Sequence, residues 1–207
     1  YATGQWIQLA SDLGATPTGA GKMVCRDPAG NIYSAAVSQS IWKYASGTWT
    51  ELSNNGLLNF SGLGALVFDS ARNRLLRVSC DANHWLTIDA STGSVTDVSG
   101  LLSGTGSVVA DLNALILVDS PGCCYDPDND RFCIPTGSGA SFYSINAATW
   151  AVTLVTPGTV SGSVPNAIDN GTNAAVQGRF KYVPRLRGIA YVAKGAANAW
   201  FLPTASI

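Results

Sequence analysis

The chain has 207 residues, of which only 12% are Asp, Glu, Lys or Arg, and its formal net charge is −1. This balance argues against a nucleic-acid partner, because such a protein needs a positive field that neutralises phosphates. With 46% hydrophobic residues the chain can bury a core without a metal or disulfide scaffold, and no stretch has the length of a membrane span. We therefore expect no nucleic-acid partner, no membrane insertion and no cofactor.

In chain order, short segments rich in aromatic and β-branched residues recur between Gly, Pro, Asn and Asp, which predicts antiparallel strands. The pattern is most complete in residues 120–156, where four strands follow one another. With the turn between the first and second strands as a ruler, four copies align without gaps. The aligned turns are residues 27–31, 69–73, 126–130 and 183–187. One such sheet cannot bury both of its faces, so the copies are expected to stack on one another.

The predicted sheets occupy about residues 23–53, 62–100, 120–156 and 178–204. Their third strands carry aromatic residues, and we expect most tryptophans to pack between sheets. These tryptophans are Trp42, Trp49, Trp85 and Trp200. The last copy ends without a fourth strand, and residues 3–9 match the fourth-strand segment 92–98. The sequence thus predicts one all-β domain over residues 1–207, a four-bladed β-propeller of four-stranded antiparallel sheets whose last blade is completed by an N-terminal strand at 4–10.

The blade pattern resembles that of Kelch or galactose-oxidase-type β-propellers. It combines DPxxN turns, an aromatic third strand and a GxWTxL-like fourth strand at residues 47–52. The stretch at 178–192 is similar to the final blades of propellers in bacterial secreted and phage-encoded proteins. This resemblance implies a protein that acts outside the cell or within a virion.

Long connections between the sheets are predicted at residues 10–22, 53–63, 99–119 and 156–178, and all would emerge on one face. Loops of this length are often functional. Within them, residues 108–118 read either as a further strand or as a packed helical turn. The candidate binding residues on these connections are Asn54, Asn55, Phe60, Asp111, Asp119, Asp169 and Asn170.

Three aspartates, Asp27, Asp69 and Asp126, open the aligned turns, where their carboxylates can accept from backbone N–H groups. We expect this turn role rather than a ring of carboxylates at the axis. Asp126-x-Asp128-x-Asp130 resembles the start of a calcium loop but lacks the glycine and the distal glutamate, so no metal site is predicted. His84 has no nucleophile motif such as GxSxG beside it, and no catalytic residue is predicted.

Five cysteines are present, and Cys124 and Cys133 flank the turn of one predicted hairpin. They could face each other across the two strands and form a disulfide. Buried free thiols that act as small apolar side chains are the other interpretation.

A complete ring, low charge and loops rich in Ser, Thr, Asn and Gly favour a non-catalytic binding or assembly module outside the cell. We expect a phage virion component (tail, fibre or capsid decoration) or an adhesin domain that contacts a protein or a glycan. The alternative is a carbohydrate-active hydrolase or lyase with paired carboxylates from Asp111, Asp119 and Asp169 on the long-loop face. A propeller that only spaces other domains is a third possibility.

Overall fold

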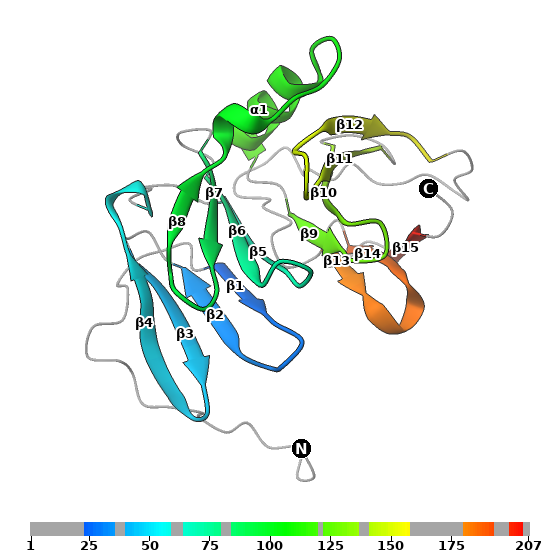
Figure 1. Ribbon diagram of the computed structural model, residues 1–207. Helices are drawn as coiled ribbons and strands as arrows, with labels where there is room; N and C mark the ends of the chain where they lie inside the picture. Colours follow the sequence, from blue (N-terminus) through cyan, green and yellow to red (C-terminus); the bar gives the residue numbers. More distant parts are fainter. Residues whose placement is uncertain are drawn as a thin grey trace.

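The computed structural model (Figure 1) describes residues 23–35, 40–58, 64–79, 84–119, 122–136, 141–157, 180–192 and 199–204. These residues form four antiparallel sheets arranged as the four blades of a β-propeller. The first strands of successive blades contact one another, β1 with β5, β5 with β9 and β9 with β13, so they form the inner layer of the arrangement. The predicted all-β propeller is confirmed.

Within each blade the strands follow one another in sequence order. Blade 1 comprises β1 (Met23–Arg26), β2 (Ile32–Ala35), β3 (Ser40–Ala45) and β4 (Thr48–Asn54). Blade 2 comprises β5 (Gly64–Asp69), β6 (Arg74–Ser79), β7 (Trp85–Asp89) and β8 (Val95–Asp97). Blade 3 comprises β9 (Cys124–Asp126), β10 (Arg131–Pro135), β11 (Phe142–Asn146) and β12 (Val152–Val155). Blade 4 comprises β13 (Phe180–Val183), β14 (Gly188–Val192) and β15 (Ala199–Pro203).

Blade 4 has three strands within the described part of the chain, whereas each of the other blades has four. β14 lies between β13 and β15, so one edge of β15 has no strand partner among the described residues. The strand predicted at residues 4–10 to complete this sheet lies outside the described residues.

The turns between the first and second strands depend on a residue in the left-handed region, which closes the turn before the second strand begins. In blades 2, 3 and 4 this residue is the fifth of the aligned turn: Asn73 (φ 48°), Asp130 (φ 49°) and Arg187 (φ 48°). In blade 1 it is the fourth, Gly30 (φ 95°), and the turn is one residue shorter. The gap-free alignment of the four copies is therefore wrong by one residue after the turn of the first copy.

Among the described residues the core consists of three clusters of buried side chains, between blades 1 and 2, blades 2 and 3, and blades 3 and 4. The blade 1–2 cluster joins Met23, Tyr33, Ala35 and Ile41 to Leu66, Leu75, Leu86 and Ile88. The blade 2–3 cluster joins Ala65, Leu76, Val78 and Trp85 to Tyr125, Phe132, Ile134 and Ile145. The blade 3–4 cluster joins Cys124, Cys133 and Phe142 to Phe180, Ile189 and Tyr191. Burial of these apolar side chains is the main force that holds neighbouring blades together.

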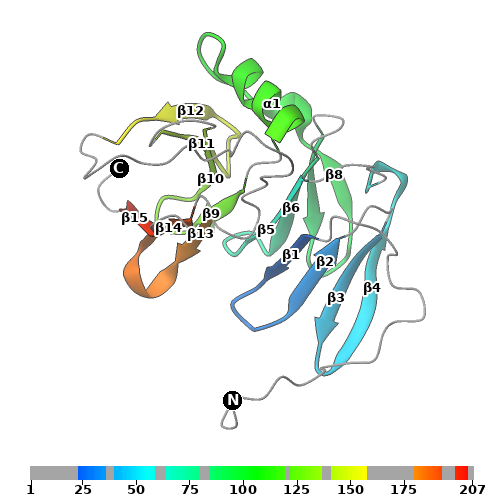
Figure 2. The ribbon, with the colours of Figure 1, turned by 180° about the vertical axis from the view of Figure 1, so that it is seen from behind.

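Residues 108–118, whose structure the sequence left open, belong to a helix, α1 (Val108–Asp119), which is apolar around most of its circumference. Leu112 and Ile116 enter the blade 2–3 cluster, and Trp85 Nε1 donates to Asn113 Oδ1 at 3.2 Å. From both sides of the molecule, α1 lies next to β12, at one end of blades 2 and 3 (Figure 1, Figure 2). Short 3-10 turns are η1 (Gly56–Leu58), η2 (Ser99–Leu101) and η3 (Pro184–Leu186). None of the described helices is long and apolar enough to cross a membrane.

Candidate functional site

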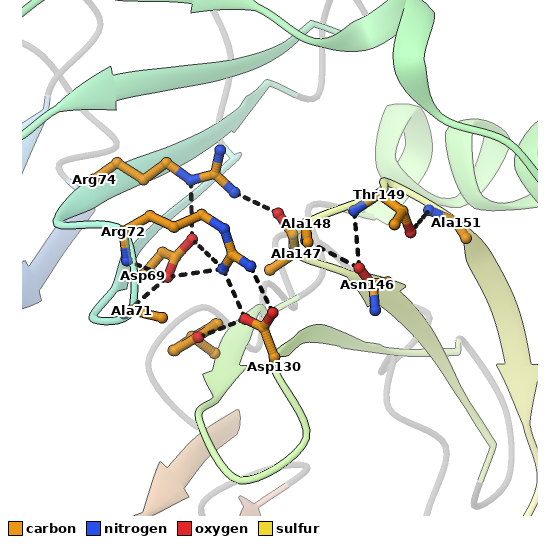
Figure 3. Close-up of polar contacts among 11 residues, drawn as sticks. Asp69, Ala71, Arg72, Arg74, Asp130, Asn146, Ala147, Ala148, Thr149 and Ala151 are labelled. Atoms are coloured by element: carbon orange, nitrogen blue, oxygen red, sulfur yellow. Dashed lines mark hydrogen bonds and ion pairs between the residues drawn. The ribbon is translucent and has the colours of Figure 1, made fainter.

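Asp69 ends β5 at the turn into β6, and its side chain is fully buried. Its Oδ1 accepts hydrogen bonds from the backbone N–H groups of Ala71 (3.1 Å) and Arg72 (3.2 Å), which confirms the predicted turn role. Its Oδ2 accepts from Arg72 Nη1 at 3.2 Å and from Arg74 Nε at 2.9 Å (Figure 3). Two guanidinium groups therefore neutralise this buried charge, and the backbone satisfies its remaining lone pairs.

The same arrangement recurs in blades 3 and 1. Asp126 accepts from the backbone N–H of Asp128 (3.1 Å) and from Arg131 Nε (3.0 Å). Asp27 accepts from the backbone N–H (2.9 Å) and Nδ2 (2.6 Å) of Asn31. In blades 1, 2 and 3 the residue directly after the left-handed position donates to Oδ2 of the aspartate. Sequence reasoning missed this pair, although an arginine five residues after the aspartate marks it in the second and third copies.

Arg72 links the turn of blade 2 to the turn of blade 3. Its Nη1 and Nη2 donate to Oδ1 (2.7 Å) and Oδ2 (2.5 Å) of Asp130, a two-pronged ion pair (Figure 3). Tyr125 Oη also donates to Asp130 Oδ1 at 2.8 Å. These bonds, with that from Arg72 the strongest, lower the pKa of Asp130 to about 2, and burial raises the pKa of Tyr125. A carboxylate held in this way stays charged at neutral pH.

Arg74 links the same two blades a second time. Its Nη2 donates to the carbonyl oxygen of Ala147 in the turn between β11 and β12 (Figure 3), and its guanidinium lies 5.0 Å from the centroid of the Trp150 ring. Asn146 Oδ1 fixes that turn by accepting from the backbone N–H groups two and three residues later, at 3.0 and 2.8 Å. The two arginines of blade 2 thus hold two separate turns of blade 3.

Asp128 links blade 3 to blade 4. Its Oδ2 accepts from Tyr182 Oη at 2.7 Å and from Arg187 Nε at 3.1 Å. These hydrogen bonds lower the pKa of Asp128, whereas burial and then the bond to Asp128 raise the pKa of Tyr182 to about 12. Asn129 Nδ2 donates to the carbonyl oxygen of Thr204 at 3.1 Å. The turns of blades 2, 3 and 4 are therefore connected along one side of the propeller.

The calcium-like spacing of Asp126, Asp128 and Asp130 does not produce a common site. The three carboxylates have different partners. Asp126 accepts from Arg131 of the same blade, Asp128 accepts from Arg187 of blade 4, and Asp130 accepts from Arg72 of blade 2. Within the described ranges, no group of three or more His, Cys, Asp or Glu is arranged to hold a metal ion.

The predicted binding residues are spread over different connections. Asn54 ends β4 and is exposed, and Asn55 Oδ1 accepts from the backbone N–H of Leu57 at 2.9 Å. Asp111 lies in the first turn of α1, where Ser107 Oγ donates to its Oδ2 at 2.7 Å, and Asp119 is the last residue of α1. Phe60, Asp169 and Asn170 lie outside the described residues. Among the described candidates, Asn54 and Asn55 lie at the end of blade 1 and Asp111 lies on α1; the binding role of all seven residues stays a prediction.

His84 is half-buried directly before β7. The pKa of Asp97 at the end of β8 is lowered by hydrogen bonds from Ser99, and the charge of His84 lowers it further. His84 therefore lies near a carboxylate that serves a turn, since Asp97 Oδ1 accepts from the backbone N–H of Ser99 at 2.8 Å.

A second surface, which sequence reasoning did not single out, is one face of the blade 1 sheet. We call it the blade 1 aromatic face; its apolar side chains are Val24, Ile32, Trp42, Tyr44 and Trp49, and the register places Arg26, Ser34 and Glu51 on the same face. The register places Tyr44 opposite both Ile32 and Trp49, and the Tyr44 and Trp49 rings are 5.2 Å apart and tilted by 55°. The blade 1–2 cluster occupies the other face of this sheet, so the aromatic face points away from blade 2.

The equivalent face of blade 2 is buried. Trp42 pairs with Ser34 on β2, and Leu86 of blade 2 pairs with Arg77 at the same place on β6. Leu86 is therefore the counterpart of Trp42, and it is buried against blade 1. Val24 is 52% exposed, whereas Leu66 at the same place in blade 2 is 4% exposed. Predicted packing between blades is confirmed for Trp85 and Trp200, whereas Trp42 and Trp49 are half-exposed and belong to none of the three clusters.

No protein-family model matches the chain, and no curated protein matches it. Among solved structures it is similar to virginiamycin B lyase from Staphylococcus aureus, with 16% identity over 93% of this chain and 55% of that one and a TM-score of 0.51. It is also similar to a chain of a nidogen/laminin complex, with 12% identity over 85% of this chain and 57% of that one and a TM-score of 0.52. The chain thus spans little more than half the length of these relatives, and the likeness supports the propeller fold alone.

Proposed function

We propose that this propeller is a non-catalytic binding or assembly module that acts outside the cell. The observation that carries the proposal is the blade 1 aromatic face, because the partly exposed rings of Trp42 and Tyr44 lie where blade 2 has the buried Leu86 and Ile88. A group of apolar side chains that the folded chain leaves partly exposed is typical of an interaction surface. Aromatic rings suit this task because they bury a large area and stack on sugar rings or on apolar protein side chains.

The charged side chains also favour binding over hydrolysis. A glycoside hydrolase needs one carboxyl group whose pKa is raised so that it can donate a proton. The carboxylates of the turns are instead paired with arginines or hydrogen-bond donors, and the pKa values of Asp128 and Asp130 are lowered. These two groups are therefore suited to holding blades together and not to acting as general acids.

The backbones of the alternative pair on α1 lie farther apart along the helix than the carboxyl groups of a retaining glycosidase. Asp111 and Asp119 are eight residues apart on one helix. Because a helix rises about 1.5 Å per residue, their backbones are about 12 Å apart along its axis. Retaining glycosidases place their two carboxyl groups about 5–5.5 Å apart. The pairing of either residue with Asp169 stays a prediction, because Asp169 lies outside the described residues.

The more specific form of the proposal is a phage virion component (tail, fibre or capsid decoration) or an adhesin domain that contacts a protein or a glycan. The resemblance of residues 178–192 to the final blades of propellers in bacterial secreted and phage-encoded proteins supports it. The low charge and the Ser, Thr, Asn and Gly content agree with a surface that works outside the cell.

Quantitative mass spectrometry of purified virions and of cell-surface fractions tests this proposal. We expect the chain as a stoichiometric component of one of these, together with retention on a glycan array or on the purified particle. Absence from both fractions, combined with measurable turnover of a polysaccharide by the purified protein, would overturn it. In that case Asp111, Asp119 and Asp169, each replaced by Asn, become the residues to examine.

A further inference from the structure

Two cysteines of blade 3 face each other across neighbouring strands. Cys124 on β9 and Cys133 on β10 are direct partners in the antiparallel register, so their side chains are on the same face of the sheet. Both are free thiols, and the Cys133 side chain hydrogen-bonds that of Cys124. The sequence-based expectation that the two residues lie opposite each other is thus confirmed.

The surroundings of this dithiol are apolar and dry. Cys124 is 4% exposed and Cys133 is fully buried in the blade 3–4 cluster, next to Phe142 of blade 3 and Phe180 of blade 4. Burial raises the pKa of the Cys124 thiol, so little thiolate is present in the folded protein. Cys123 is buried in a different cluster, between blades 2 and 3.

We propose that Cys124 and Cys133 form a disulfide when the chain folds in an oxidising compartment. Directly opposite residues of an antiparallel pair have Cβ atoms about 4.5–5.5 Å apart, and a disulfide needs about 3.5–4.5 Å. A small approach of β9 and β10 is therefore sufficient. The bond joins the inner strand of blade 3 to its neighbour and closes a loop of only ten residues, 124–133.

The reaction is an exchange with a small disulfide such as oxidised glutathione. The Cys124 thiolate attacks one glutathione sulfur and releases the other as glutathione thiolate, and the Cys133 thiolate then attacks the Cys124 sulfur of the mixed disulfide. A second glutathione leaves, so the protein loses two protons and two electrons while one oxidised glutathione becomes two reduced ones. The Cys133 thiolate can equally attack glutathione first, and the Cys124 thiolate then attacks the mixed disulfide.

The position of blade 4 determines when this exchange occurs. With blade 4 packed on blade 3, Phe180, Ile189 and Tyr191 cover the dithiol and exclude both reagent and water. During folding, before these side chains dock, the two thiols are accessible and have ordinary pKa values. The bond therefore forms early and is then protected, so the same cluster that slows oxidation of the reduced native protein also slows reduction of the oxidised one.

The experiment compares refolding with and without oxidant. Denatured, fully reduced protein is refolded in a glutathione redox buffer, and thiols are counted with Ellman's reagent under denaturing conditions. The chain contains five cysteines, so five thiols are expected after refolding in dithiothreitol and three after refolding in the redox buffer. Tandem mass spectrometry of the non-reduced digest should link Cys133 to Cys124 and not to Cys123. Native reduced protein should lose the same two thiols much more slowly.

Matched variants separate the pair from its neighbour. The Cys133→Ala variant should keep all four of its thiols in the redox buffer. The Cys123→Ala variant should fall from four thiols to two, because the Cys123 side chain lies on the opposite face of the sheet from the pair. The oxidised wild-type protein should also unfold at a higher denaturant concentration than the reduced protein, and Cys133→Ala should show no such difference. Retention of all five thiols by wild-type protein, or a link from Cys133 to any other cysteine, would overturn the proposal; both measurements are independent of whether a variant folds.

Discussion

Blades 1 and 2 are built from the same repeat, yet the equivalent faces of their sheets differ in exposure. In blade 2 the face that meets the preceding blade is buried, and Arg72 and Arg74 hold two turns of blade 3. In blade 1 the corresponding face is the aromatic face, and Asn31 stands where blade 2 has Arg74. Between blades 1 and 2, Lys43 Nζ donates to the Ala90 carbonyl oxygen at 3.4 Å, which is longer than the bonds from Arg72 to Asp130 between blades 2 and 3. The comparison indicates that blade 1 is held to blade 2 mainly by its apolar cluster, whereas ion pairs also hold blade 2 to blade 3.

The largest expected effect is on the buried ion network. Asp69→Ala leaves Arg72 and Arg74 without their shared carboxylate, so we expect the free energy of unfolding to fall by about 3–5 kcal/mol. Asp27→Ala in blade 1 removes the acceptor of hydrogen bonds from the neutral Asn31 and Tyr33 side chains, so we expect a loss of about 1–3 kcal/mol. Urea denaturation measures both. The control is Asp89→Ala, since that carboxylate serves an exposed turn, where it accepts from the backbone N–H groups of Ser91 and Thr92 and from the Thr92 side chain. Equal losses for Asp69→Ala and Asp27→Ala would contradict the comparison.

The next effect compares equivalent positions on the two faces. Leu86→Ala opens a cavity in the blade 1–2 cluster, and we expect a loss of about 2–5 kcal/mol in the free energy of unfolding. Trp42→Ala removes a larger side chain, but from a half-exposed position, so we expect less than about 2 kcal/mol. The denaturant midpoints of the two variants show which of them loses more stability. A larger loss for Trp42→Ala would show that the aromatic face is buried within the folded chain.

Blade 4 extends the comparison to the sheet with three described strands. If residues 4–10 add the fourth strand to β15, deletion of residues 1–10 removes several ladder hydrogen bonds at about 1 kcal/mol each. We therefore expect a loss of about 2–3 kcal/mol and faster amide hydrogen exchange in β15 than in β4 or β12. Trp6→Ala serves as the milder control, because it keeps the backbone that would pair. Unchanged exchange in β15 after the deletion would remove the strand prediction.

The smallest effect is the acid dependence of the link between blades 2 and 3. Arg72 lowers the pKa of Asp130 from 3.8 to about 2 in the folded protein. The contribution of this group to stability is therefore present above about pH 4 and is lost as the pH falls towards 2. The difference in free energy of unfolding between the wild-type protein and Asp130→Asn should shrink over this window. A constant difference from about pH 5 to pH 2 would contradict the assignment.

The repeat could be predicted from sequence because its strands and turns are local features. Short segments rich in aromatic and β-branched residues predicted all four sheets, and Asp-led turns marked three of them; the turn role of Asp27, Asp69 and Asp126 followed from residue type. The helix at α1 could not be predicted, because a segment that is apolar on nearly all sides has no clear period of 3.6 or 2.

The aromatic face was missed because two connections of blade 1 are each one residue shorter than their counterparts in blade 2. The turn at Gly30 shifts the second strand by one position, and the connection between the paired residues Ala35 and Ile41 is one residue shorter than that between Val78 and Trp85. Side chains in a strand alternate between faces, so each shift of one position exchanges the two faces. Trp42 and Trp85 look equivalent in the sequence, yet Ile41 is the true counterpart of Trp85. The inter-blade pairs, such as Arg72 with Asp130, could not be predicted because they depend on which turns meet in space.

The central claim is that the chain binds its partner through the blade 1 aromatic face. Two apolar residues with equal exposure allow a direct test: Val24 on this face and Leu154 on β12 are both 52% exposed. Val24→Ser and Leu154→Ser should have similar stability, and retention on the glycan array or on the purified virion or cell-surface fraction is measured for both. We predict that Val24→Ser weakens retention at least tenfold while Leu154→Ser leaves it unchanged. Equal retention of the two variants, or a loss confined to Leu154→Ser, would contradict the account.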